Sequence, residues 1–438
     1  MIERHIGLVL AVTALSGTMA LSALAQTEIE VWVGGEPGTT NIYDDLADAY
    51  MAANADVQIT VTKVGSDLFN PVLVPSLSGG EGPDVFMYGT GPGQPAAIIN
   101  GGLVADLTPY YRQYGWDAVI PESIENTTSS DGRLWAVGNQ VENTAMFYNR
   151  AIFDELGLQV PETWADFEAA VDTLIEAGYT TPIGLGGADR WPISHWQSML
   201  FGRFASPAGV EEVMFGDGAW TEEPYRAAMA LLQEMAEEGY FGPNPVANGY
   251  AETMDSFWAG DIPMTFTGPW IVPPAIDALG DGIADFGSFQ LPPMADGQAI
   301  HPTEDIGSGW YINANTEHLD VSADVLDFFF FDDGSRLMLL NDGTIPIGPL
   351  TDLLPESSLP PIVAELRAQI DSYRPNGTIH AFLDTVTPAS MTNVTYDGLQ
   401  ALLLGVMTPE QFVEAIQAEW EVAKADGAIL MPGGVADN

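Results

Sequence analysis

The stretch VENTAMFYNRAIFDELGLQVPETWADF (141–167) marks the place where the chain changes its folding pattern. Its apolar centre predicts a buried strand. Its end carries Thr163 and Asp166 at the spacing of a helix-capping box, so a helix is expected to begin there. The polar pair at its front, Glu142 and Asn143, has no evident structural role. The purpose of this pair is a question that the rest of the sequence has to answer.

Strand and helix patterns alternate before this stretch and are interrupted after it. Extended patterns lie at 28–35, 57–64 and 82–93, with a helical pattern at 41–54. This alternation predicts βαβ units around a largely parallel sheet. The later chain is helix-rich, and extended patterns return at 261–270 and 307–315. We therefore expect an α/β protein with two lobes, each assembled from non-contiguous segments.

The charge of the chain excludes several classes of partner. Its 438 residues include 12 basic and 61 acidic residues, for a formal net charge of -49. Such a surface repels nucleic acid and anionic membranes, so neither is expected as a partner. Because salt screens the self-repulsion of an acidic surface, we expect a marine or hypersaline medium. The alternative is an acidic periplasmic protein with no adaptation to salt.

The N-terminus predicts export. Residues 1–25 contain an apolar run and end in the small-residue site Ala23-Leu24-Ala25, which predicts a signal peptide cleaved after Ala25. The alternative is a retained membrane anchor, since residues 6–25 are uncharged and long enough to span a bilayer. The chain has no cysteine, so we expect no disulfide and no cysteine-linked lipid anchor. A freely diffusing periplasmic protein is the favoured interpretation.

No catalytic motif accompanies these features. The sequence has no G-x-S-x-G, no H-E-x-x-H, no P-loop and no G-x-G-x-x-G after a strand. Its five histidines do not have metal-ligand spacing. We therefore expect neither an enzyme nor a cofactor or metal site. The alternative is a secreted glycoside hydrolase, which needs two carboxylates placed across the scissile bond.

Four stretches carry a resemblance to a known family. They are GPDVFMYG (82–89), ENTAMFYNRAIFDELGLQVPETWADF (142–167), FWAGDIPMTFTGPW (257–270) and GSGWYINANTEHLDVSADVLDFFFFDDGSR (307–336). In this order the chain resembles the carbohydrate-type extracellular solute-binding proteins, the periplasmic receptors of ABC importers, in the group that includes maltose-binding protein.

The resemblance implies a two-lobed periplasmic-binding-protein fold. Each lobe is expected to be a mostly parallel sheet flanked by helices, and hinge strands join the lobes. The first lobe is expected at 26–139 plus 285–345 and the second at 140–284 plus 346–438. A monomer would bind a sugar or oligosaccharide in the interlobe cleft and deliver it to a membrane permease. A polyol, a glucosylated compatible solute or glycerol 3-phosphate are the alternative ligands.

The resemblance and the chemistry of a sugar together indicate the candidate site residues. Hydroxyl edges need carboxylates, amides and other hydrogen-bonding groups, whereas the flat C–H faces pack on aromatic rings. In the first lobe the loops after the strands supply candidates, and Gly307 and Gly309 allow close backbone approach. Asp67 is equally compatible with the surface, and Pro37 stands where maltose-binding protein has a lysine. These first-lobe candidates are Glu36, Asp67, Tyr88, Gly89, Thr90, Asp305, Gly307, Gly309 and Trp310.

The second set of candidates lies at the crossing and in the second lobe. The resemblance implies that Trp270 is the first choice for a ring that stacks on the sugar, because the family commonly stacks a sugar ring there, and Trp191 matches the region of another stacking aromatic. Arg190 either donates to the ligand or pairs with a structural acid, and His195 is expected to be structural. In the resemblance Glu142 matches a cleft carboxylate at the crossing between the lobes, and its alternative is a solvated acid. These candidates are Glu142, Asn143, Arg190, Trp191, Trp270 and Arg374.

Overall fold

The structure is a computed structural model that describes residues 26–34, 41–120, 122–304, 306, 308–350, 352–354, 359–376, 379–380 and 382–436. For residues 66–70, 122–123, 277, 374 and 379–380 it describes the backbone alone. The expected signal peptide at 1–25 lies outside the described residues. No helix in the described part of the chain combines the length and apolarity needed to cross a membrane.

The first lobe is built on a five-stranded sheet. The strand order is β2 (Val57–Val64), β1 (Thr27–Gly34), β3 (Val85–Tyr88), β12 (Gly309–Ile312) and β6 (Val137–Gly138). Its helices are α1 (Ile42–Ala53), α2 (Ser66–Ser78), α3 (Ala96–Asn100), α4 (Thr108–Gln113), α5 (Glu122–Thr128), α12 (Leu319–Phe330) and α13 (Asp333–Asp342). A hairpin of β4 (Ser129–Ser130) and β5 (Arg133–Leu134) follows α5.

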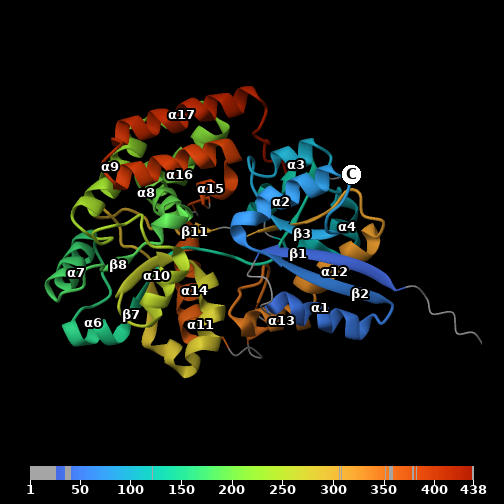
Figure 1. The fold of residues 1–438 in the computed structure, drawn as a ribbon, viewed down its shortest axis with the longest axis horizontal. Coiled ribbons are helices and arrows are strands. Elements are labelled where there is room, and N and C mark those ends of the chain that lie inside the picture. Colours follow the sequence, from blue (N-terminus) through green and yellow to red (C-terminus); the bar gives the residue numbers. More distant parts are fainter. Residues whose placement is uncertain are drawn as a thin grey trace, which may run out of the picture.

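The second lobe is built on a four-stranded sheet. The strand order is β10 (Phe286–Phe289), β7 (Ala145–Asn149), β9 (Met264–Thr267) and β8 (Ile183–Gly184). Its helices are α6 (Arg150–Leu156), α7 (Trp164–Glu176), α8 (Trp191–Phe215), α9 (Glu223–Glu237), α10 (Tyr250–Trp258), α11 (Val272–Leu279), α14 (Pro361–Tyr373), α15 (Leu383–Val386), α16 (Ala389–Leu403) and α17 (Pro409–Ala425). Figure 1 shows the two groups of helices as two lobes lying side by side. The predicted two-lobed α/β class is confirmed.

One strand in each sheet runs against the others. In the first sheet β12 is antiparallel to both β3 and β6, while β1 is parallel to β2 and β3. In the second sheet β7 is antiparallel to both β10 and β9, while β8 is parallel to β9. Both reversed strands come directly after a crossing from the other lobe. Each reversed strand therefore begins at the end of its sheet that faces the other lobe. The other strands of that sheet finish at this same end.

Three segments cross between the lobes. The first joins β6 to β7, the second joins β10 to β12 through the short strand β11 (Thr303–Glu304), and the third joins α13 to α14. The first and third crossings are hydrogen-bonded to one another, since Val141 N–H donates to the Ile345 carbonyl over 2.8 Å. Strand β11 pairs in parallel with β13 (Ile379–His380). The first and third crossings therefore form a hydrogen-bonded pair of hinge segments.

Local signals of the sequence are confirmed in the second lobe. Capping boxes start α7 at Thr163 and α17 at Thr408, with Asp166 and Gln411 as the reciprocal partners. Trp420 is fully buried in the core of this lobe, as its helical spacing predicts. The helical spacing of Trp164 and Trp258 among apolar neighbours predicts burial as well, but both are only partly buried, at the margins of their clusters.

Candidate ligand-binding site

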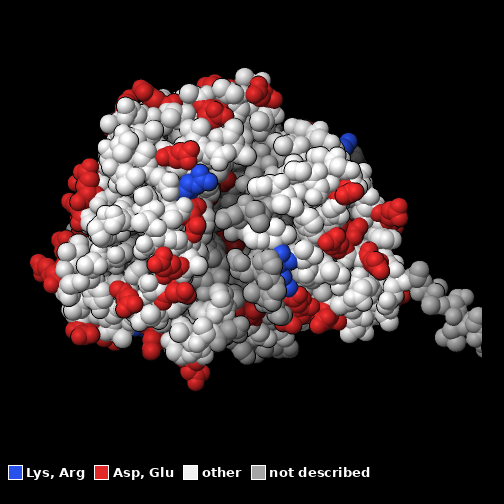
Figure 2. Space-filling view, in the orientation of Figure 1, with Lys and Arg blue, Asp and Glu red and all other residues white. Residues whose placement is uncertain are grey.

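The facing edges of the two sheets define the candidate site. In the first sheet Gly309, which begins β12, lies opposite Tyr88 and Gly138 at the ends of β3 and β6. In the second sheet Ala145, which begins β7, lies opposite Thr267 at the end of β9. The crossing segments join these edges, so the loops after the strands face the other lobe. Figure 2 shows the surface hollowed between the two lobes.

The second lobe contributes an aromatic wall, which we define as Trp191, His195, Tyr250, Trp270 and Phe382. These side chains come from the starts of α8 and α10, from the turn after β9 and from the residue before α15. The ring centroids of Trp191 lie 4.3 Å from Tyr250 and 6.1 Å from Trp270. Trp191, Tyr250 and Trp270 are partly exposed, so the wall presents aromatic surface to the groove.

Trp270 is held in a fixed orientation. Its indole N–H donates to the Tyr250 hydroxyl over 2.7 Å, and that hydroxyl lies 2.7 Å from the Thr267 Oγ1. A Cβ atom on Gly268 would lie 1.9 Å from the Trp270 ring, so only glycine fits beneath the indole. The ring is therefore positioned before any ligand arrives, which lowers the ordering cost of binding.

His195 and Phe382 are the buried members of the aromatic wall and pack behind its exposed rings. Their rings are stacked with centroids 4.1 Å apart, and His195 also lies 5.5 Å from the Trp270 ring. Both are almost fully buried. Burial lowers the pKa of His195 to about 3, so its imidazole is neutral at neutral pH. The structural role expected for His195 fits this position, although its Nδ1 has no hydrogen-bond partner among the described residues.

Glu142 lies between the two lobes. The Gln140 side-chain amide donates to its carboxylate. Burial is the main cause that raises the pKa of Tyr43 in the first lobe and of Tyr250 in the second, and the charge of Glu142 adds to both shifts. One carboxylate thus acts on a tyrosine of each lobe. It is placed where a hydroxylated ligand between the lobes would meet it.

Asn143 and Thr90 are buried polar side chains without a partner. Asn143 is 0% exposed, and neither its amide oxygen nor its amide nitrogen has a hydrogen-bond partner among the described residues. The Thr90 hydroxyl is equally buried and unpartnered in that part of the chain. A buried polar group without a hydrogen bond lowers the free energy of unfolding, so neither side chain is optimal for stability.

The first lobe presents small residues rather than rings. Gly89 accepts a hydrogen bond on its carbonyl from the Tyr311 hydroxyl over 2.7 Å, which fixes the start of the loop after β3. A Cβ atom on Gly309 would lie 2.8 Å from the Thr90 Cγ2, so this pairing needs glycine. Tyr88 is mostly buried and meets Tyr311 edge-on. The first-lobe wall is therefore made of backbone and short side chains.

Two candidates take roles other than ligand contact in this structure. Trp310 is 0% exposed and packs against Tyr43 and Phe330 in the first-lobe core, so the expectation that its side chain meets the ligand is corrected. Gly309 and Trp310 are neighbours in a strand, and neighbours point to opposite faces. Arg190 pairs with Asp397 over 3.1 Å and lies over the Tyr396 ring. This is the pairing with a structural acid that was the alternative to ligand contact.

The remaining candidates cannot be placed. Glu36, Asp305 and Gly307 lie outside the described residues, and so do the side chains of Asp67 and Arg374. They stay predictions.

Sequence reasoning missed two members of the wall and one residue opposite it. Tyr250 and Phe382 reach Trp270 from segments far away in the chain, and Tyr43 reaches Glu142 from the first helix. No local signal identifies them. By contrast, His195 follows Trp191 by four residues on α8, and this spacing places both side chains on one helical face.

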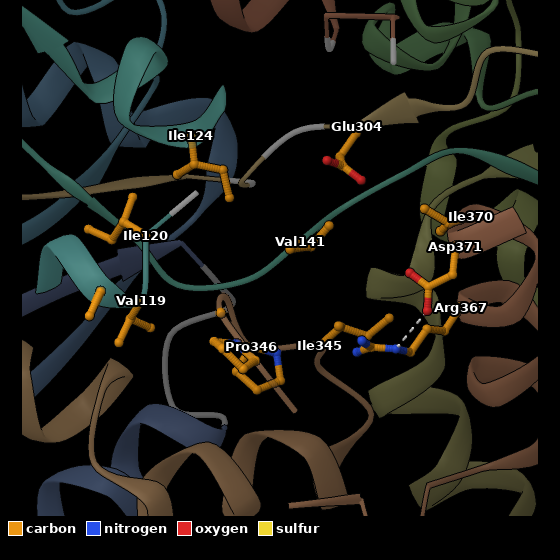
Figure 3. A pocket seen from close by; sticks show the side chains of 13 residues that line it. Val119, Ile120, Ile124, Val141, Glu304, Ile345, Pro346, Arg367, Ile370 and Asp371 are labelled. Carbon is orange, nitrogen blue, oxygen red and sulfur yellow. Dashed lines mark ion pairs between the residues drawn. The ribbon is translucent and has the colours of Figure 1, made fainter. Parts of the chain in front are cut away.

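A cavity of about 470 Å³ lies behind the first crossing segment (Figure 3). Val141 lines it, whereas Gln140 and Glu142 meet each other on the other side of this extended segment. The first lobe adds apolar side chains, and α14 adds Arg367 paired with Asp371 over 3.4 Å. This cavity differs from the groove at the aromatic wall in its mainly apolar lining and in its position.

Comparisons with known proteins agree on one family. The family model described as bacterial extracellular solute-binding protein matches residues 36–335, which is more than half of the chain. The multiple sugar-binding protein of Streptococcus mutans is 26% identical over 249 residues, covering 50% of this chain and 56% of the relative's length. The maltotriose-binding protein of Pyrococcus abyssi is 25% identical over 347 residues, covering 77% of this chain and 70% of the relative.

Solved structures agree on the fold. A chitin oligosaccharide binding protein superposes with a TM-score of 0.79 at 19% identity, covering 91% of this chain and 99% of that one. At this identity the likeness supports the two-lobed fold alone.

Proposed function

The chain belongs to the bacterial extracellular solute-binding proteins, and from this premise we propose that it captures a sugar or oligosaccharide between its lobes and delivers it to the membrane permease of an ABC transporter. The observation that carries the proposal is the preset aromatic wall beside the Glu142 carboxylate. Indole faces accept the C–H faces of a pyranose, and a carboxylate accepts two hydroxyl hydrogens. The relatives named as sugar-binding proteins support the same ligand class.

Closure around the ligand is the proposed mechanism. The ligand contacts both walls only when the lobes are together, so it shifts the population towards the closed form by its difference in affinity. We keep the predicted lobes at 26–139 plus 285–345 and 140–284 plus 346–438, except that residues 285–289 move to the second lobe. They move because Phe286–Phe289 pair with β7 of the second sheet, so the second crossing begins after β10.

Release of an unaltered ligand is part of the proposal. The matched family and relatives are described as binding proteins, which supports a receptor rather than a hydrolase. We propose that the protein works in the periplasm as a monomer, exported with cleavage after Ala25. Mass spectrometry of the mature N-terminus, sedimentation, and incubation with labelled oligosaccharides to detect cleavage products test these three points.

The acidic surface belongs to the same proposal. Figure 2 shows Asp and Glu side chains on the visible surface of both lobes, with few Lys and Arg among them. With a net charge of -49, we propose that the protein works in a salty medium that screens this self-repulsion. The melting temperature is then expected to rise between low salt and molar salt, and a flat response contradicts this part of the proposal.

A thermal-shift screen tests the ligand class. The panel contains glucose, maltose, maltotriose, cellotriose, triacetylchitotriose, raffinose, glycerol, glucosylglycerol and glycerol 3-phosphate. At 100 times its Kd a ligand stabilises the folded state by about 2.7 kcal/mol. We expect at least one di- or trisaccharide to raise the melting temperature and glycerol 3-phosphate to leave it unchanged. A panel in which no carbohydrate raises it contradicts the proposal.

A further inference from the structure

Helix α15 joins the aromatic wall to a contact between the lobes. Phe382 comes directly before α15, and the Leu383 N–H donates to the Ser198 hydroxyl of α8 over 2.9 Å. The helix is a single turn that ends at Val386, about 6 Å further along at 1.5 Å per residue. Whatever Val386 touches therefore lies within one helical turn of the aromatic wall.

Val386 touches the loop after β3 of the first lobe directly, beside a small cavity of about 80 Å³ that Pro92 and Val386 also line. The Gly93 N–H donates to the Val386 carbonyl over 2.9 Å. A Cβ atom on Gly91 would lie 2.6 Å from the Val386 Cγ1, and one on Gly93 would lie 2.4 Å from the Pro388 backbone nitrogen. The two lobes are in direct contact here, and only glycine fits at positions 91 and 93 because a Cβ atom would collide with the other lobe.

The loop is fixed to its own lobe as well. The Gly91 N–H donates to the Thr127 carbonyl at the end of α5 over 2.8 Å. Together with the bond from Tyr311 to the Gly89 carbonyl, this holds the first half of the loop. The contact with Val386 is therefore made by a supported loop and not by an isolated tip.

The C-terminal segment 428–436 adds a second tie at the same place. It leaves α17 in the second lobe, and the Leu430 N–H donates to the Pro92 carbonyl of the loop over 2.6 Å. It then pairs with the β4–β5 hairpin of the first lobe through a Ser130–Pro432 bridge and an Ala436 N–H bond of 3.0 Å to the Gly132 carbonyl. In Figure 1 this red segment passes from α17 towards the first lobe beside α3.

We infer that these contacts form an interlobe wall, made of Gly91, Pro92, Gly93, Val386, Pro388 and Leu430, that closes one end of the groove. The ligand then binds by one chain terminus, with its terminal ring on Trp270, and extends only away from α15. The substrate class is an oligosaccharide with one free end, and internal segments of a polysaccharide are excluded. This inference rests on the proposed function.

End-capped trisaccharides test the inference on the unmodified protein. The probes are maltotriose, cellotriose and triacetylchitotriose, each free, coupled at the reducing end to 2-aminobenzamide, or capped at the non-reducing end with a 4,6-O-benzylidene acetal. Calorimetry gives the Kd of each. For a trisaccharide that binds in its free form, we expect one cap to weaken binding by 100-fold or more and the other to change it less than threefold.

Similar losses from both caps, small or large, overturn the closed-end arrangement while leaving the proposed function intact. Failure of every free trisaccharide to bind, while another carbohydrate of the thermal-shift panel binds, overturns this inference and leaves the proposed function intact. Failure of every carbohydrate of that panel contradicts the proposed function and, with it, this inference, so the two failures are distinguishable.

Two variants assign the effect to the interlobe wall. Val386→Ala removes the side chain that meets Gly91, and a chain ending at Gly427 removes the tie to Pro92. Each is expected to reduce the penalty of the disfavoured cap at least tenfold. Val171→Ala, an equally buried valine in α7 of the same lobe, is the matched control and is expected to keep the full penalty. An unchanged penalty in both variants overturns the assignment.

Discussion

The two walls of the groove are built from opposite kinds of residue. The second lobe presents rings that hold one another in place, with Trp270 bonded to Tyr250 and packed over Gly268. The first lobe presents a glycine-rich loop and the start of β12, where side chains would collide. From this difference we expect the ligand contact area to be concentrated on the second lobe, and the first lobe to supply backbone that fits closely on closure. Substitutions on the two walls should therefore have unequal effects on affinity.

The largest expected effect is on Trp270. Trp270→Ala is expected to weaken sugar binding by about 2–4 kcal/mol, since a preset aromatic ring at the centre of a site behaves as a hot spot. That corresponds to roughly 30- to 1,000-fold in Kd, measured by calorimetry. Trp164→Ala in α7 is the control, because it removes an indole of the same lobe away from the groove. Equal losses in both variants would show that stability, not contact, carries the effect.

The next effect concerns Asp384 behind the aromatic wall. Asp384 is buried and accepts a hydrogen bond from the Tyr396 hydroxyl over 2.7 Å. Burial raises the pKa of its carboxyl from 3.8 to about 6. Between about pH 4 and pH 6 the Asp384 carboxyl therefore keeps a proton in the folded state that it has lost in the unfolded chain. The resulting stabilisation is complete below about pH 4 and is lost as the pH rises to about 6.

Asp384→Asn mimics the protonated carboxyl at every pH. Urea unfolding at pH 7.5 is expected to show the variant more stable than the unmodified protein by about 3 kcal/mol, the free-energy equivalent of this shift. The difference should vanish below pH 4. Asp217→Asn, at an exposed position, is the control and should change neither value. A variant that is less stable at pH 7.5 contradicts the assignment.

A smaller effect is expected on the first wall. Thr90→Val replaces a buried hydroxyl, which has no hydrogen-bond partner among the described residues, by a methyl group of similar volume. We expect the free energy of unfolding to rise by about 1 kcal/mol, because the buried hydroxyl is no longer left without a hydrogen bond. Affinity should stay within twofold, because this wall fits by its backbone. A tenfold loss of affinity would show that the hydroxyl binds the ligand and would weaken the contrast between the walls.

The smallest effect is expected on Arg190. Its partner Asp397 has a side chain that is 77% exposed, and exposed ion pairs contribute little. Arg190→Gln should therefore lower stability by less than about 0.5 kcal/mol and leave affinity unchanged. A loss of affinity without a loss of stability would instead return Arg190 to the list of ligand contacts.

The sequence predicts what depends on neighbours in the chain. The capping boxes at Thr163 and Thr408 need only residues three positions apart, and both form. The alternation of strands and helices likewise predicts two α/β lobes. The reversed direction of β7 and β12 could not be predicted from periodicity, since it follows from the edge at which each crossing segment enters its sheet.

The candidate site divides in the same way. The Gly–Pro–Trp turn at 268–270 is a local pattern, and the structure places Trp270 on the groove. The rings that support it come from residues 250 and 382, and only the folded chain brings them together. Trp310 was expected beside the ligand because it adjoins Gly309. The alternation of a strand instead sends its ring into the core.

The central claim is that a sugar binds between the lobes with a ring on the Trp270 indole. A crystal structure with the trisaccharide that binds most tightly in the thermal-shift screen tests it directly. We expect a pyranose ring in van der Waals contact with Trp270 and a sugar hydroxyl donating to the Glu142 carboxylate. Density for the sugar outside the groove, or in the groove without contact to Trp270, contradicts the claim.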